Sequence, residues 1–162
     1  MEKYIGVKMI SAIAMTRLAY NEYRGWVMPD DEDGSEDGYL VEYEDNDHPC
    51  HPDHKGYISW SPKEVFDDSH RPTEGMSFGF AIEAMRKGKK VARQGWNGKN
   101  MWLIMDPGTT GAVINDRSVY GRAGLDCVDI NPHIDMMTAT GEMQPGWLAS
   151  QTDMLADDWV IV

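Results

Sequence analysis

The hydrophobic pattern in the second half of the chain predicts one helix followed by several strands. Phe78, Ala81, Ile82 and Met85 follow the i, i+3, i+4, i+7 spacing of a single helix face, and Gly88 is a candidate stop. Short apolar segments with turn residues between them come next, at residues 89–96, 101–106, 112–115, 133–147 and 159–162. The segment 133–147 reads as a hairpin. One helix leading into an antiparallel sheet is an α+β arrangement.

The first half of the chain also combines helical spacing with the alternating pattern of strands, in shorter segments. Residues 3–16 are apolar and favour a strand, and 39–44 and 56–60 alternate as two partner strands. A short helix is predicted over 16–25, with Thr16 as N-cap and Gly25 as stop. A second helix is predicted over 61–71, with Ser61 as N-cap and Pro62 in the first turn. This half is therefore a small α+β module.

The segment RPTEG at residues 71–75 has the composition of a linker. We therefore place an N-terminal module at 1–71, a linker at 72–75 and a C-terminal domain at 76–162. The turn-rich acidic segment PDDEDGSEDG at 29–38 is predicted to be a solvated connection. It lacks the glutamate at the twelfth position that an EF-hand calcium loop requires.

The charge of the chain changes which partners are plausible. The net charge of the 162 residues is −12. Residues 1–71 hold 16 acidic and 7 basic residues, a balance of −9, which leaves −3 for residues 72–162. Affinity for DNA or RNA depends on Lys and Arg that neutralise phosphates, so nucleic-acid coating is disfavoured. A small anion remains possible, because a few well-placed donors set the local field.

Location and redox state are also constrained. No apolar run is long enough to cross a bilayer, and the start MEKYIGVKMI does not resemble a signal peptide, so a cytosolic location without membrane partners is expected. Cys50 and Cys127 lie far apart in the sequence and do not form a disulfide framework. Both are expected to be free thiols.

One segment invites a metal hypothesis. The run DNDHPCHPDHKG places four potential zinc ligands within seven residues: His48, Cys50, His51 and His54. Two prolines stiffen this run, and no second ligand pair has finger-like spacing elsewhere in the sequence. A solvated loop between two strands is the favoured interpretation, and no metal or other cofactor is expected.

Catalytic motifs are not apparent. The sequence has no G-x-S-x-G, no P-loop and no cysteine in a known catalytic signature. His133 could be a base, a ligand or a satisfied structural histidine. Asp157 and Asp158 are adjacent carboxylates, and in a strand they would point to opposite faces, which argues against a shared acid–base pair. The sequence therefore favours a protein that is not an enzyme.

The segment VARQGWNGKNMWLIMDPG predicts a hairpin that turns at Asn97, with a tryptophan at its exposed tip. Aromatic, guanidinium, amide and carboxylate groups near this tip and in a second segment suit a nucleotide ligand. The candidate set is Arg93, Trp96, Asn97, Trp147, Ser150, Thr152 and Asp153. From the residues alone, the tryptophans could equally be core, and Ser150 or Thr152 could be helix caps.

Two long blocks of the second half resemble a known family. MSFGFAIEAMRKGKKVARQGWNGK, NPHIDMMTATGEMQPGWLASQTDMLADDWVIV and the spacing between them are similar to the second type of phage Thoeris anti-defence protein, over about residues 76–162. The first segment is similar to a separate small phage module without an established role. The loop from Pro107 to Asn131 is longer than in compact members of the family.

The resemblance implies sequestration rather than catalysis. Such proteins act as sponges in the host cell cytoplasm, where they bind glycocyclic ADP-ribose, the signal of TIR-based Thoeris immunity, and keep it intact. Some members also bind cyclic dinucleotides of CBASS immunity at a separate site. The family forms homo-oligomers, typically tetramers, with pockets between subunits.

Carried onto this sequence, the resemblance makes Trp96 a stacking residue covered by ligand and a second subunit. Asp153 would then contact ribose or base, and Arg93 and Asn97 would be polar contacts. A nucleotide-degrading enzyme and a phage structural module without a ligand remain the alternatives.

Overall fold

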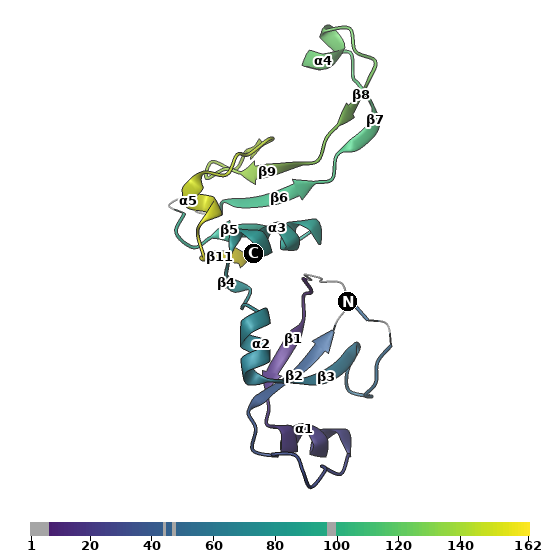
Figure 1. The fold of residues 1–162 in the computed structure, drawn as a ribbon. Coiled ribbons are helices and arrows are strands. Elements are labelled where there is room, and N and C mark those ends of the chain that lie inside the picture. Colours follow the sequence, from purple (N-terminus) through teal and green to yellow (C-terminus); the bar gives the residue numbers. More distant parts are fainter. Residues whose placement is uncertain (1–6, 44, 47, 97–99) are drawn as a thin grey trace, which may run out of the picture. The chain divides into compact units, whose positions relative to one another are not determined.

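A computed structural model describes residues 7–43, 45–46, 48–96 and 100–162. The chain forms two compact units, residues 1–71 and 72–162, and each has its own sheet (Figure 1). Among the described residues, no helix is long and apolar enough to span a membrane. Both units combine helices with antiparallel strands, so the predicted α+β class is confirmed.

The N-terminal unit is built on one antiparallel sheet of order β1-β2-β3. Its strands are β1 (Ser11–Ala14), β2 (Gly38–Tyr43) and β3 (Tyr57–Pro62). The predicted pairing of the two alternating segments is confirmed, with Leu40 opposite Trp60. Leu40 and Ile58 are buried together with Tyr20 from the first helix, and these side chains form the core of the unit.

Helix α1 (Arg17–Arg24) begins and ends where the sequence predicts. The Thr16 hydroxyl accepts a hydrogen bond from the Ala19 N–H, and Gly25 closes the helix with φ = 65°. A left-handed residue at this position satisfies the last helical carbonyls, and glycine adopts it without steric cost. Both capping predictions are confirmed.

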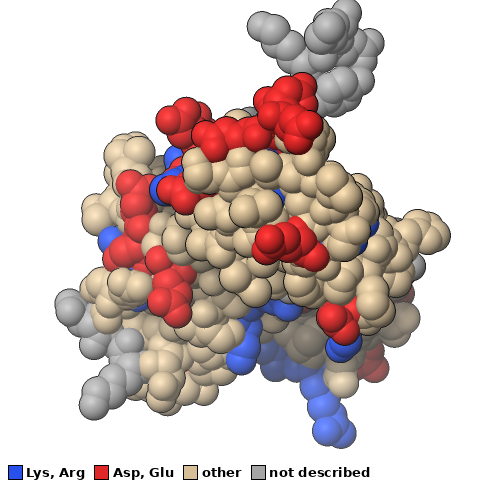
Figure 2. All heavy atoms as spheres, turned by 90° about the horizontal axis from the view of Figure 1, so that it is seen from below, with Lys and Arg blue, Asp and Glu red and all other residues tan. Residues whose placement is uncertain are grey.

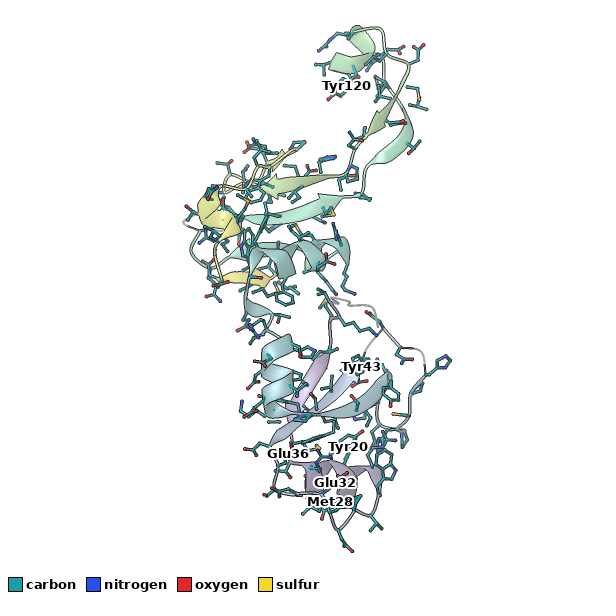
Figure 3. The ribbon with its side chains drawn as sticks, viewed as in Figure 1. Tyr20, Met28, Glu32, Glu36, Tyr43 and Tyr120 are labelled. Atoms are coloured by element: carbon teal, nitrogen blue, oxygen red, sulfur yellow. The ribbon has the colours of Figure 1, made fainter. Side chains whose placement is uncertain are left out.

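The acidic connection after α1 is anchored by one arginine. The Arg17 guanidinium donates to Glu32 at 2.9 Å and to Glu36 at 2.8 Å, and both carboxylates lie beside α1 (Figure 3). Acidic side chains are spread over the face that Figure 2 shows. Two acidic side chains of this connection are therefore paired rather than purely solvated.

Helix α2 (Lys63–Ser69) starts later than predicted. Pro62 occupies the N-cap position and closes β3, whereas Ser61 lies within that strand and does not cap the helix. The prediction of Ser61 as N-cap is wrong because Ser61 is committed to the sheet, where it pairs with Tyr39. Lys63 supports the helix through an ion pair with Asp67, one turn later.

In the C-terminal unit, the described residues form a six-stranded sheet of order β10-β9-β6-β5-β11-β4. The strands are β4 (Glu74–Met76), β5 (Val91–Arg93), β6 (Trp102–Asp106), β9 (His133–Met137), β10 (Met143–Gln144) and β11 (Trp159–Ile161). The hairpin predicted over 133–147 is confirmed as the β9–β10 pair, and in its turn the Gly141 N–H donates to the Thr138 carbonyl. The last strand, β11, lies inside the sheet between β5 and β4.

Helix α3 (Phe78–Arg86) packs on this sheet as its apolar spacing predicts. Ala81 and Met85 are fully buried against Val91, Leu103 and Trp159 of the sheet. Lys87 is the C-cap, and Gly88 follows with φ = 74°. Burial of large side chains such as Trp159 supplies the main driving force for this unit.

A ribbon extends from the sheet between β6 and β9. It consists of β7 (Thr109–Val113) and β8 (Cys127–Ile130), which pair with each other, and of α4 (Val119–Arg122) at its end (Figure 1). Tyr120 lies on α4 (Figure 3). The predicted strand at 112–115 is thus confirmed in part, because β7 includes Ala112 and Val113 but ends there, and the long 107–131 segment contains a hairpin.

Candidate functional site

Four aromatic side chains from distant parts of the sequence meet at one end of the C-terminal sheet. Trp159 on β11 is completely buried. Its ring centroid lies 5.5 Å from Trp96, 6.3 Å from Trp147 and 5.3 Å from Phe78. Trp96 and Trp147 also contact each other edge to face, with centroids 6.3 Å apart. This aromatic cluster of Phe78, Trp96, Trp147 and Trp159 is the floor of the candidate site.

The prediction that Trp96 stands at an exposed hairpin tip is wrong, as this packing shows. Strand β5 ends at Arg93 and β6 begins at Trp102, so the connection is longer than a two-residue turn. Trp96 folds back from this connection onto Trp159 and is half-buried. A large indole gains more from covering an apolar core than from standing in water. Trp96 therefore needs no ligand to be partly covered, although part of its surface stays open.

Arg93 is the electrostatic centre of the site. Its Nε donates to Asp158 Oδ1 at 2.7 Å, and its Nη1 donates to Asp153 Oδ1 at 3.0 Å. Register places Arg93 directly opposite Trp159, which brings the preceding Asp158 into reach. Hydrogen bonds from Arg93 lower the pKa of the Asp158 carboxyl, and the two carboxylates raise the pKa of Arg93. The Arg93 guanidinium was expected to bind a ligand, but most of its N–H donors already bind Asp158 and Asp153.

Asp153 belongs to the helix α5 (Gln151–Met154) that covers the cluster. Its Oδ2 accepts hydrogen bonds from the Ser150 N–H at 3.0 Å and hydroxyl at 2.6 Å, while its own N–H donates to Ser150 Oγ. These reciprocal bonds form a capping box, so the alternative of Ser150 as a helix cap is confirmed. The main-chain carbonyl of Asp153 also accepts from Trp159 Nε1 at 3.0 Å.

The Asp153 carboxylate stays ionised in spite of its burial. Burial raises its pKa, but hydrogen bonds from Ser150, Arg93 and the Trp96 indole outweigh this effect and leave the pKa below its usual range. A carboxylate has about four acceptor positions, and these bonds use most of them. Asp153 therefore ties α5 to the Trp96 connection and has little acceptor capacity left.

Asp158 is the site residue that sequence reasoning missed. As strand residues, Asp157 and Asp158 would point to opposite faces, but β11 begins only at Trp159, so both precede it. Asp157 is exposed, whereas Asp158 also accepts from the Gly95 N–H at 3.0 Å. The sequence does show a carboxylate directly before Trp159. Its role becomes visible only when β5 is known to pair with β11, because that register places Trp159 opposite Arg93.

The other predicted residues are placed as follows. Trp147 is half-buried in the aromatic cluster, and Thr152 is exposed on α5. Asn97 lies outside the described residues. The structure thus brings Arg93, Trp96, Trp147, Ser150 and Asp153 together, as one network with Asp158.

Two large aliphatic side chains of the segment around α5 are exposed. Leu148, just before α5, is 89% exposed, and Leu155, at its C-cap, is 78% exposed. Large aliphatic side chains that stay in water next to half-buried tryptophans are typical of a surface that another molecule covers. The arrangement suits stacking of a planar ring and exclusion of water, and it offers a rigid carboxylate–guanidinium network beneath.

The histidine-rich loop of the N-terminal unit is held by contacts within the chain. His54 Nδ1 lies 2.8 Å from Glu42 Oε2, and its Nε2 lies 2.9 Å from the Tyr23 hydroxyl. The His51 ring stacks on Tyr23 at 4.4 Å. Cys50 Sγ accepts from the Ile58 N–H and from Arg24. These residues pack part of the loop against α1 and β3, while His48 and Asp53 are exposed, so the predicted solvated loop is confirmed in part.

Comparison with known proteins links the C-terminal unit to one family. The model of the Tad2-like family, described as the Thoeris anti-defense 2-like domain, matches residues 76–162. The chain is also 38% identical over 87 residues to Thoeris anti-defense 2 of Bacillus phage SP01, across 54% of this chain and 94% of that protein. The match covers every element of the candidate site, from α3 to β11. Through residues 76–162, this chain belongs to the Thoeris anti-defense 2-like family.

Proposed function

We propose that this protein counters Thoeris immunity in the infected host cell by binding the cyclic nucleotide signal, glycocyclic ADP-ribose, and holding it intact. The observation that carries the proposal is the 38% identity to Thoeris anti-defense 2 over nearly the whole of that protein. An anti-Thoeris role of phage origin follows from membership of the family. Capture of the nucleotide without hydrolysis would withhold it from its effector.

The half-buried tryptophans support a nucleotide ligand. Trp96 and Trp147 are fixed against Trp159 at 5.5 and 6.3 Å, so their open surfaces are held in place before a ligand arrives. Stacking of a base on an aromatic side chain contributes about 1–3 kcal/mol. A purine ring of the ligand would stack on Trp96, as the resemblance of the sequence implies.

The polar residues take a different role from the one expected for them. Because Asp158 and Asp153 occupy most of the Arg93 fork, Arg93 is a positioning residue for the Trp96 connection. Asp153 and Ser150 fix α5 in the same way. The candidates for direct polar contact with the ligand are then Thr152, which is exposed, and Asn97.

A sponge must compete with the effector for the same ligand. A dissociation constant in the nanomolar range corresponds to about −12 kcal/mol. Binding surfaces that are already ordered avoid much of the entropic cost of association. The salt-bridged network between β5, α5 and β11 supplies such order.

A second copy of the chain would complete the site. Leu148 and Leu155 beside α5 are mostly exposed, as are Val113, Val119 and Tyr120 on the β7–β8 ribbon. Exposed apolar side chains in these two regions favour self-association, and a homotetramer is the expected form. Light scattering coupled to size-exclusion chromatography would measure the mass directly.

Calorimetric titration with glycocyclic ADP-ribose, followed by heat denaturation and mass analysis of the released ligand, tests the proposal. Tight binding and intact release are expected. Release of a modified product would favour the nucleotide-degrading enzyme instead. Absence of binding by a correctly assembled protein would favour the structural module.

Trp96→Ala gives the first residue-level prediction. Loss of stacking should weaken glycocyclic ADP-ribose binding by about tenfold or more, because 1.4 kcal/mol corresponds to a factor of ten. Trp26→Ala is the matched control, since Trp26 is 53% exposed in the other unit. If Trp96→Ala dissociated the oligomer and the control did not, Trp96 would be an interface residue rather than a ligand contact.

Cyclic dinucleotides of CBASS immunity are the second probe in the same titration. The resemblance places them at a separate site, so their binding should survive Trp96→Ala. Equal loss of both ligands in this variant would mean that they share one site.

A further inference from the structure

A compact group of metal-binding side chains lies away from the aromatic cluster, at the base of the β7–β8 ribbon. Asp106 is the last residue of β6, and His133 is the first residue of β9. The two residues are direct partners across the antiparallel pair. Asp135 follows two positions after His133, on the same face of β9. One ligand atom from each of the three side chains lies within 4.8 Å of the others.

The histidine is oriented as a metal ligand would be. His133 Nδ1 lies 2.9 Å from the Asn131 carbonyl oxygen, which can only accept a hydrogen bond, so Nδ1 carries the proton. In the neutral ring, the lone pair is then on Nε2, and Nε2 faces Asp135 Oδ1 at 3.3 Å. A ligating histidine that donates its other ring N–H to a backbone carbonyl is the usual outer-shell arrangement of metal sites.

The carboxylates are held by backbone donors in the same manner. The Gly108 N–H donates to Asp106 Oδ1 at 2.8 Å, and the Gly146 N–H donates to Asp135 Oδ1 at 3.2 Å. Both side chains are half-buried rather than free in solvent. Oriented carboxylates lose little conformational entropy when they bind an ion.

The spacing between His133 and Asp135 fits a small divalent ion. Two ligands of a tetrahedral zinc ion, each about 2.0–2.1 Å from the metal, are about 3.3–3.4 Å apart. The 3.3 Å between His133 Nε2 and Asp135 Oδ1 equals this edge. We propose that Asp106, His133 and Asp135 form a binding site for a divalent transition-metal ion, with Zn²⁺ as the ion that their nitrogen and oxygen ligands suit.

The charges of the site favour a cation. The Asn131 carbonyl and the carboxylates of Asp135 and Asp106 surround the His133 ring with negative and partial negative charge, which would attract a metal ion. Three protein ligands leave one tetrahedral position for water. An ion here would join the end of β6 to the start of β9, at the two points where the ribbon leaves the sheet.

Titration of the chelator-treated full-length protein with zinc chloride tests the site. One saturable equivalent per chain is expected by calorimetry at neutral pH. His133→Gln and Asp135→Asn should each weaken it by more than about tenfold, because even outer-shell substitutions cost that much. Circular dichroism without metal should show that both variants remain folded.

The double variant His51→Gln/His54→Gln is the matched control, because it removes two imidazoles from the histidine-rich loop of the N-terminal unit. Its zinc stoichiometry and affinity should equal those of the unaltered protein. Cobalt loading gives a second readout that does not depend on variant folding. The spectrum should lack thiolate-to-cobalt charge transfer, since no cysteine belongs to the site.

Three results would overturn the proposal. They are absence of saturable zinc binding, binding that both His133→Gln and Asp135→Asn retain, and a cobalt spectrum with a thiolate band. The last result would assign the ion to Cys50 or Cys127, which are free thiols.

Discussion

At the scale of single residues, the candidate site depends on a guanidinium held between two carboxylates. Asp153 lies on α5 and Asp158 directly precedes Trp159, and Arg93 joins them through hydrogen bonds of 2.7 and 3.0 Å. The sequence placed Arg93, Trp96 and Asp153 among the candidates because their chemistry is recognisable in isolation. It could not identify the partners of Arg93, because these follow from the register of β5 against β11.

Asp158→Asn should destabilise the C-terminal unit by about 1–2 kcal/mol, since it removes a charged partner from a half-buried pair. Asp157→Asn is the control, because Asp157 is the exposed neighbour with the same chemistry. Urea unfolding followed by tryptophan fluorescence measures both variants. Equal effects of the two substitutions would contradict a specific role of the Arg93–Asp158 pair.

The same pair predicts a direction for pH dependence. The pKa of Asp158 is lowered in the folded protein, chiefly by Arg93, so its contribution is present above the unfolded pKa of about 4. That contribution is lost as the pH falls through the folded pKa. The stability difference between the unaltered protein and Asp158→Asn should therefore shrink below about pH 4. A difference that stays constant in acid would rule out an ionic origin.

At the scale of elements, local signals were sufficient where the chain is capped or periodic. Thr16 and Gly25 delimit α1, and the apolar spacing from Phe78 to Met85 predicts α3. Prediction failed where the sheet overrides local preference. Ser61 is a favourable cap residue in isolation, but it belongs to β3. The local sequence predicts Trp96 at a hairpin tip, because it does not show that Trp96 packs against the buried Trp159.

The β7–β8 ribbon depends on a glycine at its base. Gly108 has φ = 78°, and a Cβ there would lie 2.3 Å from the Ile130 carbonyl oxygen. Gly108→Ala should therefore add a backbone clash to the conformational strain, and hydrogen exchange of the ribbon amides should become faster. Gly124→Ala is the control, because Gly124 has φ = 84° with open space around it.

The two glycine variants separate the cost of left-handed backbone from the cost of the clash with the Ile130 carbonyl. Gly124→Ala should cost about 1–2 kcal/mol, the penalty of left-handed backbone for an alanine. Gly108→Ala should cost clearly more, as measured by urea unfolding of each variant. Equal costs would mean that the Ile130 segment moves aside, and that the close approach does not hold the ribbon.

At the scale of the whole molecule, two compact units divide the charge unequally. Residues 1–71 carry −9 of the total of −12, while the family match is confined to residues 76–162. The candidate site and the metal-binding group both lie in the C-terminal unit, which has its own buried core. If the ligand is the anionic nucleotide proposed above, the negative charge of the N-terminal unit would repel it at long range.

Residues 72–162 alone should therefore bind glycocyclic ADP-ribose at least as tightly as the full chain. Removal of the acidic unit lowers long-range repulsion of an anion, so any gain should be largest in dilute salt. The Debye length falls from about 30 Å at 0.01 M salt to about 8 Å at 0.15 M, so the two proteins should converge as salt is added. Calorimetry at both concentrations measures this. If the shortened protein were folded but bound more weakly at both, the N-terminal unit would contribute contacts or assembly rather than charge alone.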